Sequence, residues 1–147
     1  MACLPWLITT ENTAGTERVG ASLASLITGR GQEKSAFIAM YGDLGAGKTA
    51  FVRGLCSVLV PEAKVCSPTY TIVNEYRGKN TLCHFDMYRI ENDDDLYSTG
   101  FYDYSDCVIA AEWCEKIPFA LPANYYKVTI TKLGEAERRI EVTEVNG

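Results

Sequence analysis

Residues 42–49 hold three glycines, a lysine and a threonine at a spacing that suits the binding of phosphate groups. The run is GDLGAGKT, which matches the Walker A pattern G-x-x-x-x-G-K-[ST]. Glycines let backbone N–H groups approach phosphate oxygens without a clash from Cβ, and a helix that begins there points its positive end at the same anion. We therefore expect Lys48 to contact the β- and γ-phosphates of a nucleotide and the Thr49 hydroxyl to ligate Mg²⁺. The alternative is a Gly-rich turn of no special function, but the run follows an apolar stretch and opens a helical pattern, as the mechanism requires.

Two carboxylates are candidates for the acid that such a site needs to organise magnesium and the attacking water. Glu112 follows the apolar run CVIAA, at the strand end where a Walker B acid lies. Asp86 lies within HFDMYR, where a regular strand would place His84 and Tyr88 on the same face. Each acid also has an ordinary explanation: Glu112 could be a solvated acid, and Asp86 could pair with Arg89. A carboxylate flanked by apolar residues is costly unless it is paired or metal-bound, which favours a functional role for both.

A loop rich in hydroxyl groups, CSPTYTIV at 66–73, follows the helix of the Walker A run. Ser67, Thr69 and Thr71 could close over the γ-phosphate as the switch loops of P-loop proteins do. The stretch could equally be a plain Ser-Pro turn that enters a strand.

The identity of the nucleotide base, adenine or guanine, is indicated by the absence of one motif from the sequence. An Asn-Lys-x-Asp run, typical of guanine pockets, does not occur in the sequence, so ATP is expected rather than GTP. The basic candidates near the site are Arg53, Arg77 and Arg89, and nothing in the sequence ranks them as an arginine finger.

The elements that must position these residues alternate between strands and helices. Apolar residues recur at helical spacing in 16–27 and 48–60, and Pro61 ends the second helix. Strands are expected from apolar or alternating runs at 4–10, 35–42, 71–80, 81–90, 107–113, 125–134 and 137–145. The order predicts a single α/β domain over residues 1–147, a P-loop NTPase-like three-layer sandwich with a mixed, partly parallel central sheet and a C-terminal antiparallel hairpin.

Composition narrows the possible partners and compartments. The net charge of −5 and the pI of about 4.9 make the chain alone a poor binder of nucleic acid. No run approaches the roughly 18 apolar residues of a membrane helix, and the N-terminus lacks the features of a secretory signal. The six cysteines form no CxxC pair, which disfavours zinc, and we expect reduced thiols in a cytoplasmic protein.

Five segments in order resemble one family. They are GDLGAGKTAFVRGL, SPTYTIVNEY, HFDMYRI, TGFYDY and AAEWCEKIPFALP, and the earlier TERVGASLA is similar to the first helix of the same family. Together they closely resemble TsaE, the small P-loop ATPase of tRNA threonylcarbamoyladenosine synthesis, over about residues 16–122. Walker A alone is common to many families, but the ordered set is specific.

The resemblance implies a weak ATPase that works with the TsaB–TsaD complex, which transfers a threonylcarbamoyl group to an adenosine beside the tRNA anticodon. By position, Thr49 and Glu112 would hold Mg²⁺, Asp86 would be the acid needed for hydrolysis, Thr69 would belong to a switch-like loop, and Trp113 would lie near the nucleotide. The phosphates would be lined by Asp43, Leu44, Gly45, Ala46, Gly47, Lys48, Thr49 and Ala50. The adenine contacts, the separate roles of the two acids and the coupling of ATP hydrolysis to modification stay open.

The segment 91–106 carries six acidic residues and no basic one, which predicts a solvated loop with a short helix. Because an acidic ATPase could dock on basic partners, we expect the acids and tyrosines of this segment to contribute to a docking face, with tRNA contacted only through those partners.

Two other functional classes remain as alternatives. A small-molecule kinase would transfer the γ-phosphate to a metabolite, but it normally has a lid rich in cations, and residues 90–115 contain no Lys or Arg. A nucleotide-gated interaction module would bind ATP with negligible turnover. Hydrolysis that rises with TsaB–TsaD would distinguish the accessory ATPase from both.

Overall fold

The computed structural model describes residues 3–42, 46–69 and 71–147, and the strands among them form one seven-stranded sheet. The strands are β1 (Trp6–Thr10), β2 (Phe37–Tyr41), β3 (Val73–Arg77), β4 (Thr81–Asp86), β5 (Val108–Glu112), β6 (Tyr125–Lys132) and β7 (Arg138–Val145). Their order across the sheet is β1-β7-β6-β2-β5-β4-β3. The four inner neighbours β6, β2, β5 and β4 are parallel, whereas β7 and β1 on one side and β3 on the other pair antiparallel.

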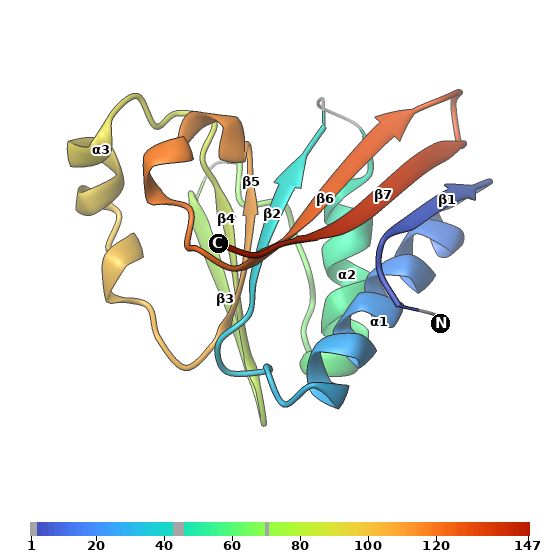
Figure 1. Cartoon of the computed structure of the whole chain (residues 1–147), viewed down its shortest axis with the longest axis horizontal. Coiled ribbons are helices and arrows are strands. Elements are labelled where there is room, and N and C mark those ends of the chain that lie inside the picture. The colour runs from blue at the N-terminus through green and yellow to red at the C-terminus, as the bar shows by residue number, and fades with distance from the viewer. Residues whose placement is uncertain (1–2, 43–45, 70) are drawn as a thin grey trace.

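Helical elements cover both faces of this sheet, as Figure 1 shows. The helices are α1 (Thr13–Gly29), α2 (Lys48–Leu59) and α3 (Asp93–Ser98), and the short 3-10 turns are η1 (Phe101–Asp103), η2 (Cys114–Lys116) and η3 (Pro118–Ala120). One buried cluster joins α1 and α2 to the sheet, and a second joins α3, η1 and η2 to the opposite face. The predicted three-layer α/β fold with a mixed sheet and a C-terminal hairpin is confirmed.

The sequence of each strand explains its place in the sheet. β2 is apolar along its length, and its residues 37–40 are all buried, as a strand covered on both faces requires. In β6, by contrast, Tyr126, Val128 and Ile130 are buried and alternate with more exposed residues, which fits a strand that joins a hairpin. The chain leaves this central strand at Tyr41, and α2 begins at Lys48, so the Walker A run connects the carboxyl end of β2 to the start of α2.

The two long helices pack closely enough to fix the direction of α2. A Cβ added at Gly54 of α2 would lie 1.9 Å from the carbonyl oxygen of Glu17 in α1, so only glycine allows this approach. α1 is itself capped at its start, where the Asn12 side chain accepts the amide of Gly15 at 2.8 Å. The packing therefore holds α2 close against α1.

Two expectations from the sequence need correction. β4 ends at Asp86, so Tyr88 lies in the turn beyond and does not share a strand face with Asp86. The segment 91–106 does contain a short helix, α3, but it is not wholly solvated, because Leu96 and Phe101 are buried in the second core. The ring of Phe101 packs edge-on against Phe85 with centroids 5.3 Å apart, which ties the segment to β4. Within the described residues, no helix has the length and apolar character to cross a membrane.

Candidate active site

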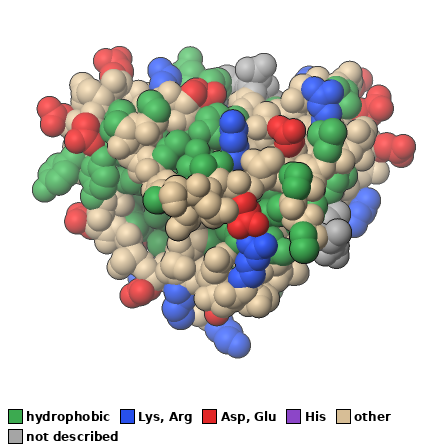
Figure 2. Space-filling model, viewed as in Figure 1, with side chains coloured by type: hydrophobic (Ala, Val, Ile, Leu, Met, Phe, Trp, Pro, Cys, Tyr) green, Lys and Arg blue, Asp and Glu red, His purple; other side chains and the backbone are tan. Residues whose placement is uncertain are grey.

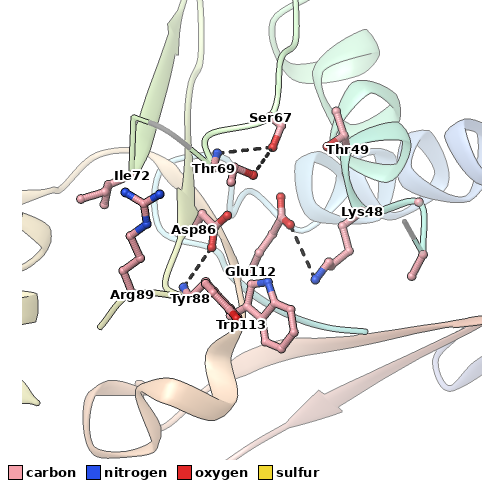
Figure 3. A pocket seen from close by; sticks show the side chains of 12 residues that line it. Lys48, Thr49, Ser67, Thr69, Ile72, Asp86, Tyr88, Arg89, Glu112 and Trp113 are labelled. Carbon is pink, nitrogen blue, oxygen red and sulfur yellow. Dashed lines mark hydrogen bonds and ion pairs between the residues drawn. The ribbon is translucent and has the colours of Figure 1, made fainter. Parts of the chain in front are cut away.

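A cavity of about 450 Å³ opens between the start of α2 and the carboxyl ends of β4 and β5. Figure 3 shows Lys48 and Thr49 of α2 facing Asp86 and Glu112 of the two strands, with Thr69 at the rim. This is the position where ligands bind in open α/β sheets, because parallel strands deliver their end residues to one edge.

The Walker A run forms the wall of the cavity on the side of α2. Gly47 has φ of 104°, a conformation that other residues rarely adopt, and it precedes the first helical residue, Lys48. The cavity wall includes Ala46, Gly47, Lys48 and Thr49, whereas Ala50 is buried in the first turn of α2, outside that wall. The sequence expectations for Asp43, Leu44 and Gly45 lie outside the described residues.

The Lys48 side chain lines the cavity and makes three contacts there. Its Nζ donates to the carbonyl oxygen of Gly42 at 2.6 Å and is 3.7 Å from Glu112 Oε1. The same nitrogen is 4.5 Å from the ring centroid of Trp113, a cation–π contact. Lys48 is 5% exposed, so these three groups compensate for most of its lost hydration.

Asp86 and Glu112 lie side by side on adjacent parallel strands, as direct partners in the register of β4 and β5. They are 7% and 6% exposed. Asp86 Oδ1 accepts the amide of Tyr88 at 2.9 Å, and Glu112 is bonded through Oε2 to His84. Two buried carboxylates side by side are costly unless a cation is near, and their oxygens are the kind of ligand that a divalent cation takes.

The donor set suits magnesium rather than a softer metal. The described residues contain no group of three or more His, Cys, Asp or Glu side chains placed to hold a metal ion. Magnesium that arrives with a nucleotide needs fewer protein ligands, since phosphate oxygens and water complete its octahedron. The oxygen atoms of Thr49, Asp86 and Glu112, which share the cavity, fit that role.

The hydroxyl loop contributes two of its three predicted side chains to the cavity. Ser67 and Thr69 line it, and their hydroxyl oxygens are 2.7 Å apart. Thr71 is turned aside, since its hydroxyl donates to Asn74 Oδ1 at 2.8 Å. The loop ends at Ile72, whose φ of 71° is unusual for a β-branched residue and is held by backbone bonds to Pro68 and Asp86.

The family model that matches this chain is described as "Threonylcarbamoyl adenosine biosynthesis protein TsaE", and it covers residues 10–140. That range includes the Walker A run, the hydroxyl loop and both strand-end acids. The chain belongs to the TsaE family.

Individual relatives agree with this assignment. The TsaE of Treponema pallidum is 33% identical over 118 residues, with 79% of this chain and 87% of the relative aligned. The TsaE of Haemophilus influenzae is 37% identical over 129 residues, with 85% of this chain and 80% of the relative aligned. Among solved structures, Bacillus subtilis YdiB matches with a TM-score of 0.71 and 26% identity, over 99% of this chain and 90% of that one.

Within this TsaE fold, the structure ranks the basic candidates and adds Tyr88 and His84 to the surroundings of the site. Arg89 lines the cavity, whereas Arg53 and Arg77 form ion pairs elsewhere, each 3.3 Å from its glutamate. Tyr88 packs its ring against Trp113 at 5.0 Å between centroids, and both line the cavity. His84 is hydrogen-bonded to Glu112. The signal in the sequence that could have placed His84 near the site is its position two residues before Asp86, on the same face of one strand.

Proposed function

We propose that this member of the TsaE family binds ATP with Mg²⁺ in the cavity and hydrolyses it slowly. In this proposal it is an accessory ATPase that works with the TsaB–TsaD complex in the threonylcarbamoylation of an adenosine beside the tRNA anticodon. The observation that carries the proposal is the convergence of Lys48, Asp86 and Glu112 on one cavity at the mouth of α2. The names of the relatives, all biosynthesis proteins for threonylcarbamoyladenosine, support the biological role.

Each residue has a role that its position supports. Lys48 would exchange its contact with Gly42 for the β- and γ-phosphates, while the backbone amides around the start of α2 bind the same oxygens. Thr49 and Glu112 would hold Mg²⁺, which when bound neutralises charge on the phosphates. Asp86 keeps one oxygen on the amide of Tyr88, and its other oxygen is the group we assign to orienting water for hydrolysis.

The Ser67 and Thr69 hydroxyls support the proposed switch-like role of their loop. They lie across the cavity from Thr49, where a terminal phosphate could order them. Trp113, already in contact with Lys48, would lie beside the nucleotide.

Partners would supply the contact to tRNA. The net charge of −5 disfavours direct binding of the chain to a phosphate backbone. In this proposal TsaB–TsaD binds the tRNA, and this chain, a single ATPase domain, binds to TsaB–TsaD. A cytoplasmic location belongs to the same proposal, since tRNA modification takes place there.

Calorimetry with ATP and Mg²⁺ tests the proposal directly. The Lys48→Ala variant should lose about tenfold to 100-fold in affinity, because a charge-assisted contact to phosphate is removed. Lys79→Ala, at an exposed lysine in the β3–β4 turn, is the matched control and should bind like the wild type. Failure of the wild-type protein to take up ATP, alone or with TsaB–TsaD, would refute the proposal.

Turnover assays separate the alternatives. ATP hydrolysis that rises when TsaB–TsaD is added supports the accessory ATPase. ADP formed only in the presence of a small metabolite would instead support a kinase, and tight binding without turnover would support a gated interaction module.

A further inference from the structure

The single histidine of the sequence, His84, is fully buried on β4 and touches one of the two candidate metal acids. Its Nε2 forms a hydrogen bond with Glu112 Oε2. Its other ring nitrogen, Nδ1, has no hydrogen-bond partner among the described residues. Among the described residues, the contact with Glu112 is therefore the one hydrogen bond that the His84 ring makes.

The missing partner at Nδ1 indicates which nitrogen carries the proton. A proton on Nδ1 would place an N–H group in a buried site without an acceptor, and that arrangement is costly. With the proton on Nε2, the ring donates to Glu112 Oε2 and leaves only a bare nitrogen unpaired.

This contact makes the two oxygens of Glu112 unequal. Oε2 is held by His84, while Oε1 is 3.7 Å from Lys48 Nζ on the side of the cavity. In the proposed function Lys48 binds phosphate, and its 3.7 Å contact with Glu112 is the weaker of the two contacts of that carboxylate. The hydrogen bond from His84 is therefore the contact that can hold the carboxylate in place whether or not nucleotide is bound.

We propose that His84 is a positioning residue that fixes Glu112 with Oε1 directed at the metal position. This inference rests on the proposed Mg-nucleotide function. Magnesium requires near-octahedral geometry, so a carboxylate with free torsions would have to be ordered each time the ion binds. Outer hydrogen bonds to metal ligands of this kind typically change metal affinity by about 10–100-fold when they are removed.

Two substitutions of similar size separate this role from simple packing. His84→Gln keeps an amide N–H near the place of Nε2, whereas His84→Met fills similar volume without a donor. The measurement is the affinity of Mn²⁺ for the protein–ADP complex, followed by electron paramagnetic resonance, beside ADP affinity in EDTA. We expect His84→Met to bind Mn²⁺ about 10–100-fold more weakly and His84→Gln to recover most of the affinity, with ADP affinity in EDTA unchanged in both.

Cys83→Ala is the matched control for lost packing, because Cys83 is buried on the same strand, next to His84, and belongs to the core cluster that contains Phe85 and Phe101. It should leave Mn²⁺ affinity unchanged. Mn²⁺ binding by His84→Met equal to that of the wild type, or binding by His84→Gln as weak as by His84→Met, would overturn the inference. Wild-type protein that takes up no nucleotide would instead overturn the proposed function.

A measurement on the unmodified protein keeps the inference testable if His84→Met fails to fold. Because the chain has one histidine, isotope-labelled histidine in untagged protein gives the nitrogen signals of a single ring. We expect the proton on Nε2, and a shift of that signal when Mg²⁺ is added to the protein–ADP complex. A proton on Nδ1, or a signal that Mg²⁺ leaves unmoved, would overturn the inference.

Discussion

Arg138 donates its Nε–H to the carbonyl oxygen of Ala46 at 2.9 Å, and so the first residue of β7 holds the loop that leads into α2. The same guanidinium donates through Nη1 to the carbonyl oxygens of Gly134 and Glu137 at 3.0 and 2.9 Å. The turn of the C-terminal hairpin and the Walker A run are therefore joined by one side chain.

Arg138→Met should weaken ATP binding by about tenfold without unfolding the protein, because the loop loses a charge-assisted bond of about 1.5–3 kcal/mol that holds its backbone. Calorimetry with ATP and a thermal melt measure the two effects. Arg139→Met is the matched control, since Arg139 is the exposed neighbour on the same strand, and it should bind as the wild type does. Unchanged ATP affinity in Arg138→Met would show that the hairpin does not shape the loop.

The contact of Arg138 illustrates what the sequence could not supply. Walker A, the apolar strands and the alternating hairpin are local patterns, and they predicted the mixed α/β fold and the place of Glu112 at the end of a strand. Arg138 and Ala46 are 92 positions apart, and their contact depends on the hairpin of β6 and β7 lying beside β2, a pairing that no local pattern encodes. The bond between His84 and Glu112 likewise depends on the pairing of β4 with β5. The end of β4 at Asp86 was missed because Tyr88 continues the alternation of side chains.

Asp86→Asn should abolish hydrolysis while ATP affinity stays close to that of the wild type. The amide oxygen of asparagine can still accept the N–H of Tyr88, so the turn after β4 is preserved while the carboxylate charge is lost. Single-turnover hydrolysis and calorimetry give the two quantities, and Asp106→Asn, at an exposed loop position, is the control. A collapse of ATP affinity in Asp86→Asn would mean that Asp86 serves binding rather than hydrolysis.

Alkylation of cysteines should depend on burial. Burial raises the thiol pKa of Cys56 to about 12 and that of Cys114 to about 12, so both stay protonated and unreactive at pH 8.5, while the exposed Cys3 and Cys66 react. Mass spectrometry after brief iodoacetamide treatment checks this, and urea should expose every thiol.

The same two pKa values predict how stability depends on pH. The unfolded chain releases the thiol protons near pH 9.0 and the folded chain only near 12, so the free energy of unfolding should fall as pH rises through that interval. Urea melts at both ends of the interval measure the slope, which Cys56→Ala should reduce. A slope that is the same in Cys56→Ala would contradict the assignment.

An acidic aromatic patch on α3 and η1, formed by Asp93, Asp94, Tyr97 and Tyr102, has the character of a docking surface. Tyr97 is 74% and Tyr102 48% exposed, and the Tyr102 hydroxyl donates to Asp93 at 2.5 Å. Figure 2 shows hydrophobic and acidic side chains gathered on the left of the molecule, where Figure 1 places α3. Exposed tyrosines beside acids fit a basic partner surface, and in the proposed function this patch would contact TsaB–TsaD.

The double variant Asp94→Lys with Tyr97→Ser should therefore lower the affinity for TsaB–TsaD by about tenfold or more, because an aromatic anchor is lost and a charge is reversed. Asp94 is the better choice than Asp95, whose carboxylate accepts the amide of Glu91 at 3.0 Å and so supports the loop. Binding measured at two salt concentrations should show that the wild-type affinity falls with salt more steeply than that of the variant.

Glu135→Lys, in the exposed turn between β6 and β7, is the matched control for a reversed charge and should keep partner affinity. ATP affinity should be unchanged in both variants, and partner binding by the double variant equal to that of the wild type would place the docking surface elsewhere.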